Sequence, residues 1–271
     1  MSTDCWKPDF VSSHPGFQDL SRFSFETLSD WPTADWLNSK LEPGLTNAKG
    51  KPVSFVAQDD TLPFPELYYE QRALLHGLVA TRTNWHDTFN AAIWSDFPRS
   101  KVAINALHVE DIERQPDKKR TPQRDALTLL DESGVLLVSD TPELLQLAID
   151  FQWEALFMQH RLLWDSQIKV YIFGHAVYEK LLNPYIGLTA HALPILVDSD
   201  FWQLSLKQQQ RQLDRRLGGH LHEGLCSSTQ VMTPLPLLGI PRWHPDNNNL
   251  TFYQNRSYFR DKTRQRLVSV L

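Results

Sequence analysis

Prolines set the two ends of this 271-residue chain apart from its middle. Eleven of the 17 prolines lie in residues 1–65 and 234–271, and the other six are spread over the region between them. Because proline lacks a backbone N–H, it is excluded from the interior of helices and of central strands. Regular structure should therefore concentrate in the middle of the chain. We expect a single compact domain over residues 1–271, with the two proline-rich segments wrapping around it.

The middle region alternates irregularly between helical and strand patterns. Apolar residues recur at helical spacing in residues 84–96 and again in residues 98–109, which predicts two helices packed as a hairpin. Residues 110–124 are charged and predict an exposed loop. A further helix is expected after Thr141, whereas residues 66–78 fit either period and are left open.

Three segments of the middle region predict strands. Residues 124–140 carry the turn signal ESG and predict a β-hairpin. Residues 168–174 are apolar on both faces, which is typical of a central strand. Residues 186–198 predict another strand, which Pro194 places at an edge or a bulge. The expected fold class is α+β, a single compact domain with helices packed on a small mixed sheet with a β-hairpin.

Composition excludes several classes of protein. The chain is 41% hydrophobic and 22% charged, as is typical of globular proteins. It has no run of about 18 apolar residues, and its first residues lack the basic start and apolar core of a signal peptide. We therefore expect a cytoplasmic protein without membrane contact. Cys5 and Cys226 are too few for a disulfide framework, so both thiols are expected to be reduced.

Charge is distributed unevenly along the chain. The net charge of −5 excludes a globally basic nucleic-acid-binding protein. Residues 201–271 nevertheless contain ten Lys and Arg against four Asp and Glu. Contact with nucleic acid is expected, if at all, through this segment. Its last part interleaves five cations with three aromatic rings, namely Arg256, Arg260, Lys262, Arg264 and Arg266 with Tyr253, Tyr258 and Phe259. Such a mixture can contact phosphates and stack on bases, or form a solvated tail.

Several familiar catalytic motifs are absent from the sequence. It contains no Gly-rich dinucleotide fingerprint, no phosphate-binding loop ending in Gly-Lys-Ser/Thr, no nucleophile elbow and no His-Glu-x-x-His. The remaining candidates are histidines and acidic residues at the ends of predicted elements.

The first candidates lie at a predicted helix start, Asn84-Trp85-His86-Asp87. Asn84 and Asp87 have the spacing of a short capping box, which is a structural role. The alternative is that His86 and Asp87 form part of a metal or substrate site. His108 ends the following helix, where the helix dipole favours a protonated imidazole. If the two helices form a hairpin, His86 and His108 reach one site.

His175 is the most informative single position. It follows Gly174 at the end of a predicted buried strand and opens a helix, where sheet-containing proteins often carry site residues. Glu179 is four residues later on the same helical face, so its carboxylate can hold one imidazole nitrogen of His175. The alternative is a hydrogen-bonded core histidine with Glu179 on the surface.

The remaining candidates carry weaker signals. His191 shares a strand face with apolar residues, where a histidine is usually half-buried and hydrogen-bonded. Arg124 and Asp125 begin the predicted hairpin and should point to opposite faces, so only one of them can reach a given pocket. Two histidines and a cysteine in residues 220–226 have ligand-like spacing but lack a fourth partner.

Four long segments resemble a known protein family. They are TRTNWHDTFNAAIWSDFPRSKVAINALH (81–108), RDALTLLDESG (124–134), FGHAVYEKLLNPYIGLTAHAL (173–193) and PLPLLGIPRWHPDNNNLTFYQNRSYFR (234–260). Together they resemble the bacterial family called domain of unknown function 3025, over most of the chain from about residue 60. The resemblance implies a bacterial cytosolic protein and carries no activity to transfer. Its polar elements, which favour an active site, correspond here to His86, Asp87, Asn105, His108, Arg124, Asp125, His175 and His191.

Two functions from different classes remain. The first is an enzyme that hydrolyses a phosphate or amide bond of a small molecule with a divalent transition metal such as Zn, Mn or Fe. Its expected metal ligands are His86, Asp87, His108, His175 and His191, and its expected catalytic residues are His175, Glu179, Asp87 and Arg124. In this hypothesis Glu179 orients His175, and Arg124 holds an anionic substrate. The second is a non-catalytic binding protein whose basic residues 201–271 contact RNA or an acidic protein.

Overall fold

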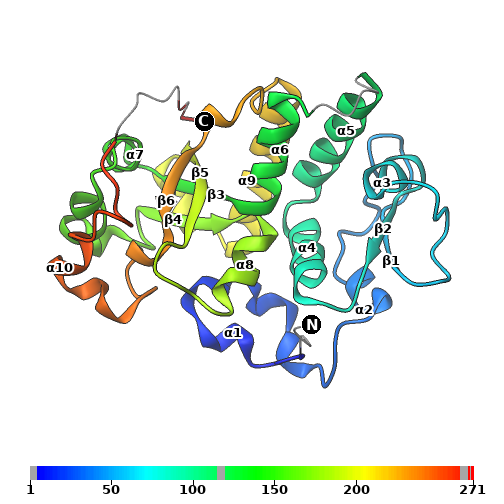
Figure 1. The fold of residues 1–271 in the computed structure, drawn as a ribbon, viewed down its shortest axis with the longest axis horizontal. Coiled ribbons are helices and arrows are strands. Elements are labelled where there is room, and N and C mark those ends of the chain that lie inside the picture. The colour runs from blue at the N-terminus through cyan, green and yellow to red at the C-terminus, as the bar shows by residue number, and fades with distance from the viewer. Residues whose placement is uncertain (1–4, 115–119, 263–267, 269) are drawn as a thin grey trace.

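The computed structural model of the chain describes residues 5–114, 120–262, 268 and 270–271 and has an α+β fold (Figure 1). The helices are α1 (Phe10–Ser13), α2 (Ala34–Asn38), α3 (Tyr69–His76), α4 (Trp85–Asp96), α5 (Pro98–Arg114), α6 (Pro122–Ser133), α7 (Pro142–Ile149), α8 (His175–Leu181), α9 (Leu206–His222) and α10 (Leu250–Tyr253). The strands are β1 (Ser54–Ala57), β2 (Leu78–Thr81), β3 (Gly134–Ser139), β4 (Ile168–Ile172), β5 (Thr189–Leu196) and β6 (Thr233–Pro236). No helix in the described part of the chain is both long and apolar enough to cross a membrane.

The larger sheet is mixed, as the sequence predicts. Its strand order is β4-β3-β5-β6, in which β3 pairs antiparallel with β4 and parallel with β5, and β5 pairs antiparallel with β6. The smaller sheet is the parallel pair of β1 and β2. The segment 66–78, whose apolar residues fit both the helical and the strand period, contains α3 and the start of β2.

The predicted β-hairpin at residues 124–140 is wrong, because its first half is helix α6. The Thr121 hydroxyl accepts a hydrogen bond from the Arg124 backbone N–H, and Pro122 occupies the first helical position. These are strong helix-start features. Leu127 and Leu130 are buried at helical spacing, so one face of α6 packs on the core. The predicted loop at residues 110–124 is also wrong at both ends, because α5 extends to residue 114 and α6 begins at residue 122.

Strand β4 was expected at the centre of the sheet but lies at its edge. It is apolar on both faces because the chain covers this edge: Ile168, Tyr171 and Ile172 are buried, and Lys169 pairs with Asp19 of the N-terminal segment at 2.8 Å. The fully buried central strand is β3. Burial on both faces therefore does not by itself distinguish a central strand from a covered edge.

Pro194 lies where β5 has lost its neighbour β6. The pairing of β5 with β6 covers Thr189 to Ala192 only. Beyond it, the Leu271 backbone N–H donates to the Pro194 carbonyl at 3.0 Å, and its carbonyl accepts from Leu196 at 2.8 Å. The N–H that proline lacks is thus missing at a local edge of an otherwise central strand, which agrees with the prediction for this residue.

The two proline-rich segments pack on the main core. Phe10, Phe17 and Phe25 from the first segment are buried in the same hydrophobic cluster as β3, β4 and β5. The first segment, blue in Figure 1, lies against α8, and the Phe17 ring stacks on Tyr178 with centroids 5.8 Å apart. From the last segment, Phe259 joins this cluster. The chain forms a single domain, and its ends complete its core.

Candidate metal centre

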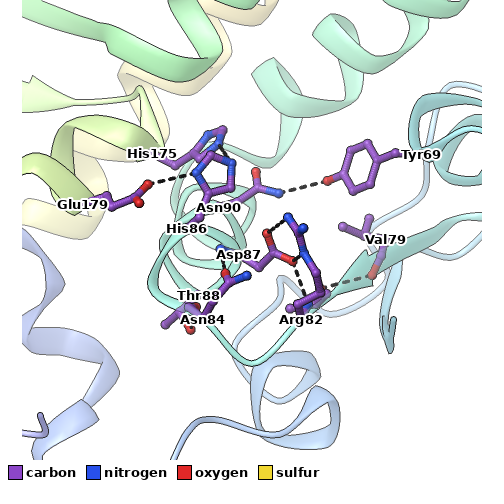
Figure 2. Close-up of polar contacts among 11 residues, drawn as sticks. Tyr69, Val79, Arg82, Asn84, His86, Asp87, Thr88, Asn90, His175 and Glu179 are labelled. Carbon is purple, nitrogen blue, oxygen red and sulfur yellow. Dashed lines mark hydrogen bonds and ion pairs between the residues drawn. The ribbon is translucent and has the colours of Figure 1, made fainter. Parts of the chain in front are cut away.

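Two helix starts and one helix end meet at the centre of the molecule. Helices α4 and α8 pack against each other, and the last turn of α6 lies beside α8 (Figures 1 and 2). The antiparallel pairing of β3 and β4 explains this arrangement: the residue that begins β3 follows α6 directly, and the strand that ends at Ile172 leads into α8. The sheet therefore brings Glu132, at the end of α6, beside His175, at the start of α8.

Two glycines allow this close approach. The Gly174 backbone N–H donates to the Gly134 carbonyl at 2.7 Å. A Cβ atom added at Gly174 would lie 2.4 Å from the Gly134 nitrogen and 2.6 Å from the Glu132 carbonyl carbon. These neighbours are backbone atoms that cannot rotate away, so only glycine fits. The spacing between Glu132 and His175 depends on this contact.

Three potential metal-ligand atoms converge at this point. Nε2 of His86 lies 3.0 Å from Nε2 of His175, and the latter is 3.6 Å from Oε2 of Glu132. The ligand atoms of all three residues lie within 4.8 Å of one another. Two atoms that each bind one ion at about 2.1 Å are about 3.0 Å apart at a right angle and about 3.4 Å apart at the tetrahedral angle. The cluster thus has residue types that ligate metals, and its atoms lie close enough together that they could hold one ion after small side-chain movements.

Glu179 holds the other side of His86. Its Oε2 lies 3.0 Å from Nδ1 of His86 (Figure 2). The sequence predicted that Glu179 would orient His175, whereas the structure places it on the histidine of the neighbouring helix. A carboxylate on Nδ1 favours a proton there and leaves the Nε2 lone pair of His86 for a metal or a hydrogen bond.

The cluster is buried on one side and open on the other. The side chain of His175 is 4% exposed, whereas those of His86, Glu132 and Glu179 are 35%, 42% and 46% exposed. Burial lowers the pKa of His175 to about 4, although the nearby Asp131 acts in the opposite direction. His175 is therefore neutral at pH 7. Solvent and small molecules can approach the open side.

A buried polar chain supports the cluster from behind. Lys101, which is 3% exposed, donates from Nζ to Asp131 and to Oδ1 of Asn90 at 2.9 Å. Asn90 in turn donates to the Tyr69 hydroxyl at 2.9 Å. Burial tends to raise the pKa of Asp131, but Lys101 and the neighbouring histidines outweigh it and lower that pKa. The chain links α3, α4 and α5 to Asp131, the residue of α6 that precedes Glu132.

His108 and Arg124 lie near this chain rather than in the cluster. His108 is buried, and burial lowers its pKa to about 4, while Asp131 opposes the shift and Lys101 and Arg124 add to it. Arg124 stands in the first turn of α6, half-exposed, at the spacing that places it on the same helical face as Asp131. The sequence predicted that His86 and His108 would reach one site. Among the described residues, however, the converging cluster consists of His86, Glu132 and His175 and does not include His108.

Asp87 and His191 have other partners. The Asp87 carboxylate accepts from the Arg82 guanidinium at 2.9 Å and from the Arg82 backbone N–H at 2.7 Å, and its own N–H donates to Asn84 (Figure 2). Asn84 thus caps α4, as the sequence allowed, but the Asp87 carboxylate binds Arg82 and does not complete a capping box at the Asn84 backbone N–H, which donates to the Arg82 carbonyl. Nδ1 of His191 lies 3.0 Å from the Ser133 hydroxyl. Neither residue brings a ligand atom to the cluster described above.

The basic C-terminal segment differs from the base-stacking surface that the sequence permits. Tyr253, Tyr258 and Phe259 are at most 5% exposed and pack in the core, so their rings are not accessible to bases. Arg256 pairs with Asp261, and Lys262 pairs with Asp150. Arg264 and Arg266 lie outside the described residues.

Sequence reasoning missed Glu132, Asp131 and Lys101. The sequence assigned Glu132 to the turn of a hairpin, so its place at a helix end beside His175 was hidden. Thr121 followed by Pro122 is the local signal for a helix start here, and the same pair at residues 141 and 142 begins α7. Lys101 could not be identified as buried from the sequence alone, because lysine is rarely buried.

The described part of the chain is thus an α+β protein with a cluster of two histidines and a glutamate at the meeting point of three helices. Residues 53–264 match the family described as Protein of unknown function (DUF3025). This match covers most of the chain, and the chain belongs to that family. No curated protein and no solved structure matches it.

Proposed function

We propose that this protein is an enzyme that binds one divalent transition-metal ion through His86, His175 and Glu132 and hydrolyses a phosphate or amide bond. The observation that carries the proposal is the convergence of two Nε2 atoms and one carboxylate oxygen within 4.8 Å, from three separate elements. Imidazole and carboxylate ligands suit Zn, Mn and Fe. Catalytic metal sites commonly use three protein ligands and leave a position for water or substrate.

A metal ion in such a centre supplies a water nucleophile at neutral pH and polarises the bond to be cleaved. The residues of the chain would prepare this chemistry. Glu179 holds His86 in the orientation that directs its Nε2 to the centre. The burial of His175 keeps one wall of the site dry, and the exposed side of the cluster admits a small-molecule substrate.

Arg124 is the proposed contact for an anionic part of the substrate. It stands two turns before Asp131 on one face of α6 and is half-exposed. Its guanidinium group can bind phosphate or carboxylate oxygens in a bidentate manner. We further propose the cytoplasm as the site of action, where reducing conditions suit the buried thiol of Cys226.

The test is elemental analysis of protein purified without chelator. We expect close to one equivalent of a transition metal in the natural protein and substantially less in His175→Ala and Glu132→Gln. His220→Ala is the matched control. His220 is a half-exposed histidine in α9, away from the cluster, and it is hydrogen-bonded to Glu223 at the end of the same helix. This control should retain the metal.

Activity is then measured on chromogenic phosphate esters and amides, with and without added Zn, Mn or Fe. The proposal expects turnover that depends on metal and on Glu132. If His86 and His175 only hydrogen-bond to each other, the natural protein will contain no metal and take up none, and the proposal is wrong.

A further inference from the structure

A second site lies on the other side of the α4–α5 junction, in a cavity of about 290 Å³. Its walls come from the end of the 3₁₀ helix η1 (Pro15–Phe23), the loop after α2, the junction between α4 and α5, and helix α9. None of its lining residues belongs to the metal cluster. Six cationic side chains line it: Arg22, Lys40, Arg99, Lys207, Arg211 and Arg215.

The acidic residues in this cavity already have partners. Asp96 is buried at its floor in an ion pair with Arg22. Asp214 is buried and accepts from the backbone N–H groups of Arg99 and Ser100, so it caps α5. Glu42 lies 4.0 Å from Arg211, which is a loose contact. The three carboxylates are too few to balance six cations.

Several of the cations have no acidic partner in the part of the chain that the structure describes. Lys207, Arg215 and Arg99 are exposed and form no ion pair with a described residue, and Lys40 lies over the Trp36 ring at 4.5 Å. This local excess of positive charge stands on a protein whose net charge is −5. A cavity that concentrates one sign of charge attracts ligands of the opposite sign.

Helix α9 presents three of these cations in a row. Lys207, Arg211 and Arg215 are spaced by four residues, which places them on one face and about 6 Å apart along the helix axis. Like charges at this spacing repel one another and destabilise a helix. An anion with several charged oxygens would remove this repulsion and bridge the row.

We propose that this basic cavity binds a small molecule that carries two phosphate groups or a diphosphate. Guanidinium groups bind phosphate oxygens in pairs, and the cavity holds several times the volume of a water molecule, about 30 Å³ in the liquid. No aromatic ring is among the described residues that line it, so it offers no stacking surface for the bases of a single-stranded nucleic acid. The ligand is therefore a small polyanion rather than RNA.

The experiment measures the binding of inorganic pyrophosphate by calorimetry to chelator-treated protein, at low and at physiological salt. We expect one site per chain whose affinity falls as salt rises. The triple variant Lys207→Gln, Arg211→Gln, Arg215→Gln should bind at least tenfold more weakly. Arg99→Gln, on a different helix, should also weaken binding.

The matched control is Lys7→Gln, Lys49→Gln, Lys51→Gln, which removes the same charge from exposed lysines outside the cavity. Its affinity should stay within twofold of the natural protein. His175→Ala should bind normally, because the cavity is separate from the metal cluster. Equal binding by the triple variant and the natural protein, or loss of binding in His175→Ala, would overturn the proposal. So would a single-stranded RNA that binds this face and is not displaced by pyrophosphate.

Discussion

At the scale of single residues, the contacts of Glu179 and of Asp96 lead to different predictions. Glu179 is exposed and touches one proposed ligand, so its charge matters for the site more than for the fold. Asp96 is buried and touches Arg22, so its charge matters for stability. The two residues therefore separate site chemistry from folding.

Glu179→Gln should lower metal affinity by about 10- to 100-fold and leave the melting temperature of the metal-free protein unchanged. The amide keeps the size of the side chain but removes the charge that orients His86. Competition with a metal indicator measures affinity, and calorimetry measures melting. Glu143→Gln, an exposed glutamate in the first turn of α7, is the control. Equal metal affinity in Glu179→Gln and the natural protein would remove Glu179 from the site.

Arg22→Ala should destabilise the protein more at high pH than at low pH. Burial raises the pKa of Asp96 to about 7, against the effect of Arg22, while Asp19 adds to the rise. Because the folded-state pKa lies above the unfolded value, the contribution of Asp96 to stability is lost as pH rises through the folded-state pKa. Without Arg22 that pKa rises further, and a buried carboxylate loses its partner.

We expect a loss in the free energy of unfolding of roughly 2–4 kcal/mol at pH 8.5 and a clearly smaller loss at pH 5.5. Urea unfolding at the two pH values measures both. In the background of Asp96→Asn, the cost of Arg22→Ala should become nearly independent of pH. If Arg22→Ala in the otherwise natural protein lowers the free energy of unfolding equally at both pH values, Asp96 is not the group that causes the pH dependence.

At the scale of elements, the site depends on how a helix end and a helix start are joined to neighbouring strands. The contact between Gly134 and Gly174 places the last turn of α6 against the first turn of α8. Any side chain at this contact must separate the two turns. Stability and metal binding should therefore change together here, in contrast to their independence at Glu179.

Gly174→Ala should lower the free energy of unfolding by roughly 2–4 kcal/mol, because its Cβ would overlap backbone atoms. It should also weaken metal binding in the protein that remains folded, since Glu132 and His175 move apart. Gly219→Ala is the control: a Cβ there meets nothing within 4 Å, and it lies inside α9. That substitution should stabilise by about 0.5–1 kcal/mol. Chemical denaturation measures the free energy of unfolding of both variants, and metal titration measures their metal affinity. Normal metal binding by Gly174→Ala would show that stability and metal binding are not coupled at this contact.

The elements of this fold differ in how far the sequence could predict them. The start of α4 at Asn84 and the strand-to-helix step at His175 follow local rules and were predicted. Helix α6 was missed because a short apolar run fits both periods, and β4 was misplaced because a covered edge has the same pattern as a central strand. Of the cluster, His86 and His175 were predicted as ligands. Glu132 was not, because its role depends on pairing between strands distant in sequence.

At the scale of the whole molecule, the N-terminal segment is part of the core rather than an appendage. Five of its side chains are fully buried in the main hydrophobic cluster: Phe10, Phe17, Leu20, Phe23 and Phe25. Full burial of one such side chain contributes about 1.5–3 kcal/mol. Deletion of the segment would also expose the core rings that it covers, including Phe89 and Tyr178, which stack on Phe17.

A chain that lacks residues 1–27 should therefore fail to fold, and limited proteolysis of the full chain should leave no stable half. Far-ultraviolet circular dichroism and gel filtration test the deletion. Phe17→Ala alone should cost about 3–5 kcal/mol, whereas Phe64→Ala, at an exposed ring, should cost much less. A cooperative thermal transition in the shortened chain would show that the segment is dispensable.

The three residues of the proposed centre are brought together only by tertiary structure, since they come from α4, α6 and α8. An unfolded chain offers no such cluster, so an ion that binds here binds the native state alone. Free metal at a hundred times its dissociation constant then raises the free energy of unfolding by about 2.7 kcal/mol. A cell short of this metal would hold more unfolded copies, which its proteases would degrade. The amount of this protein in a cell would thereby report the supply of its metal.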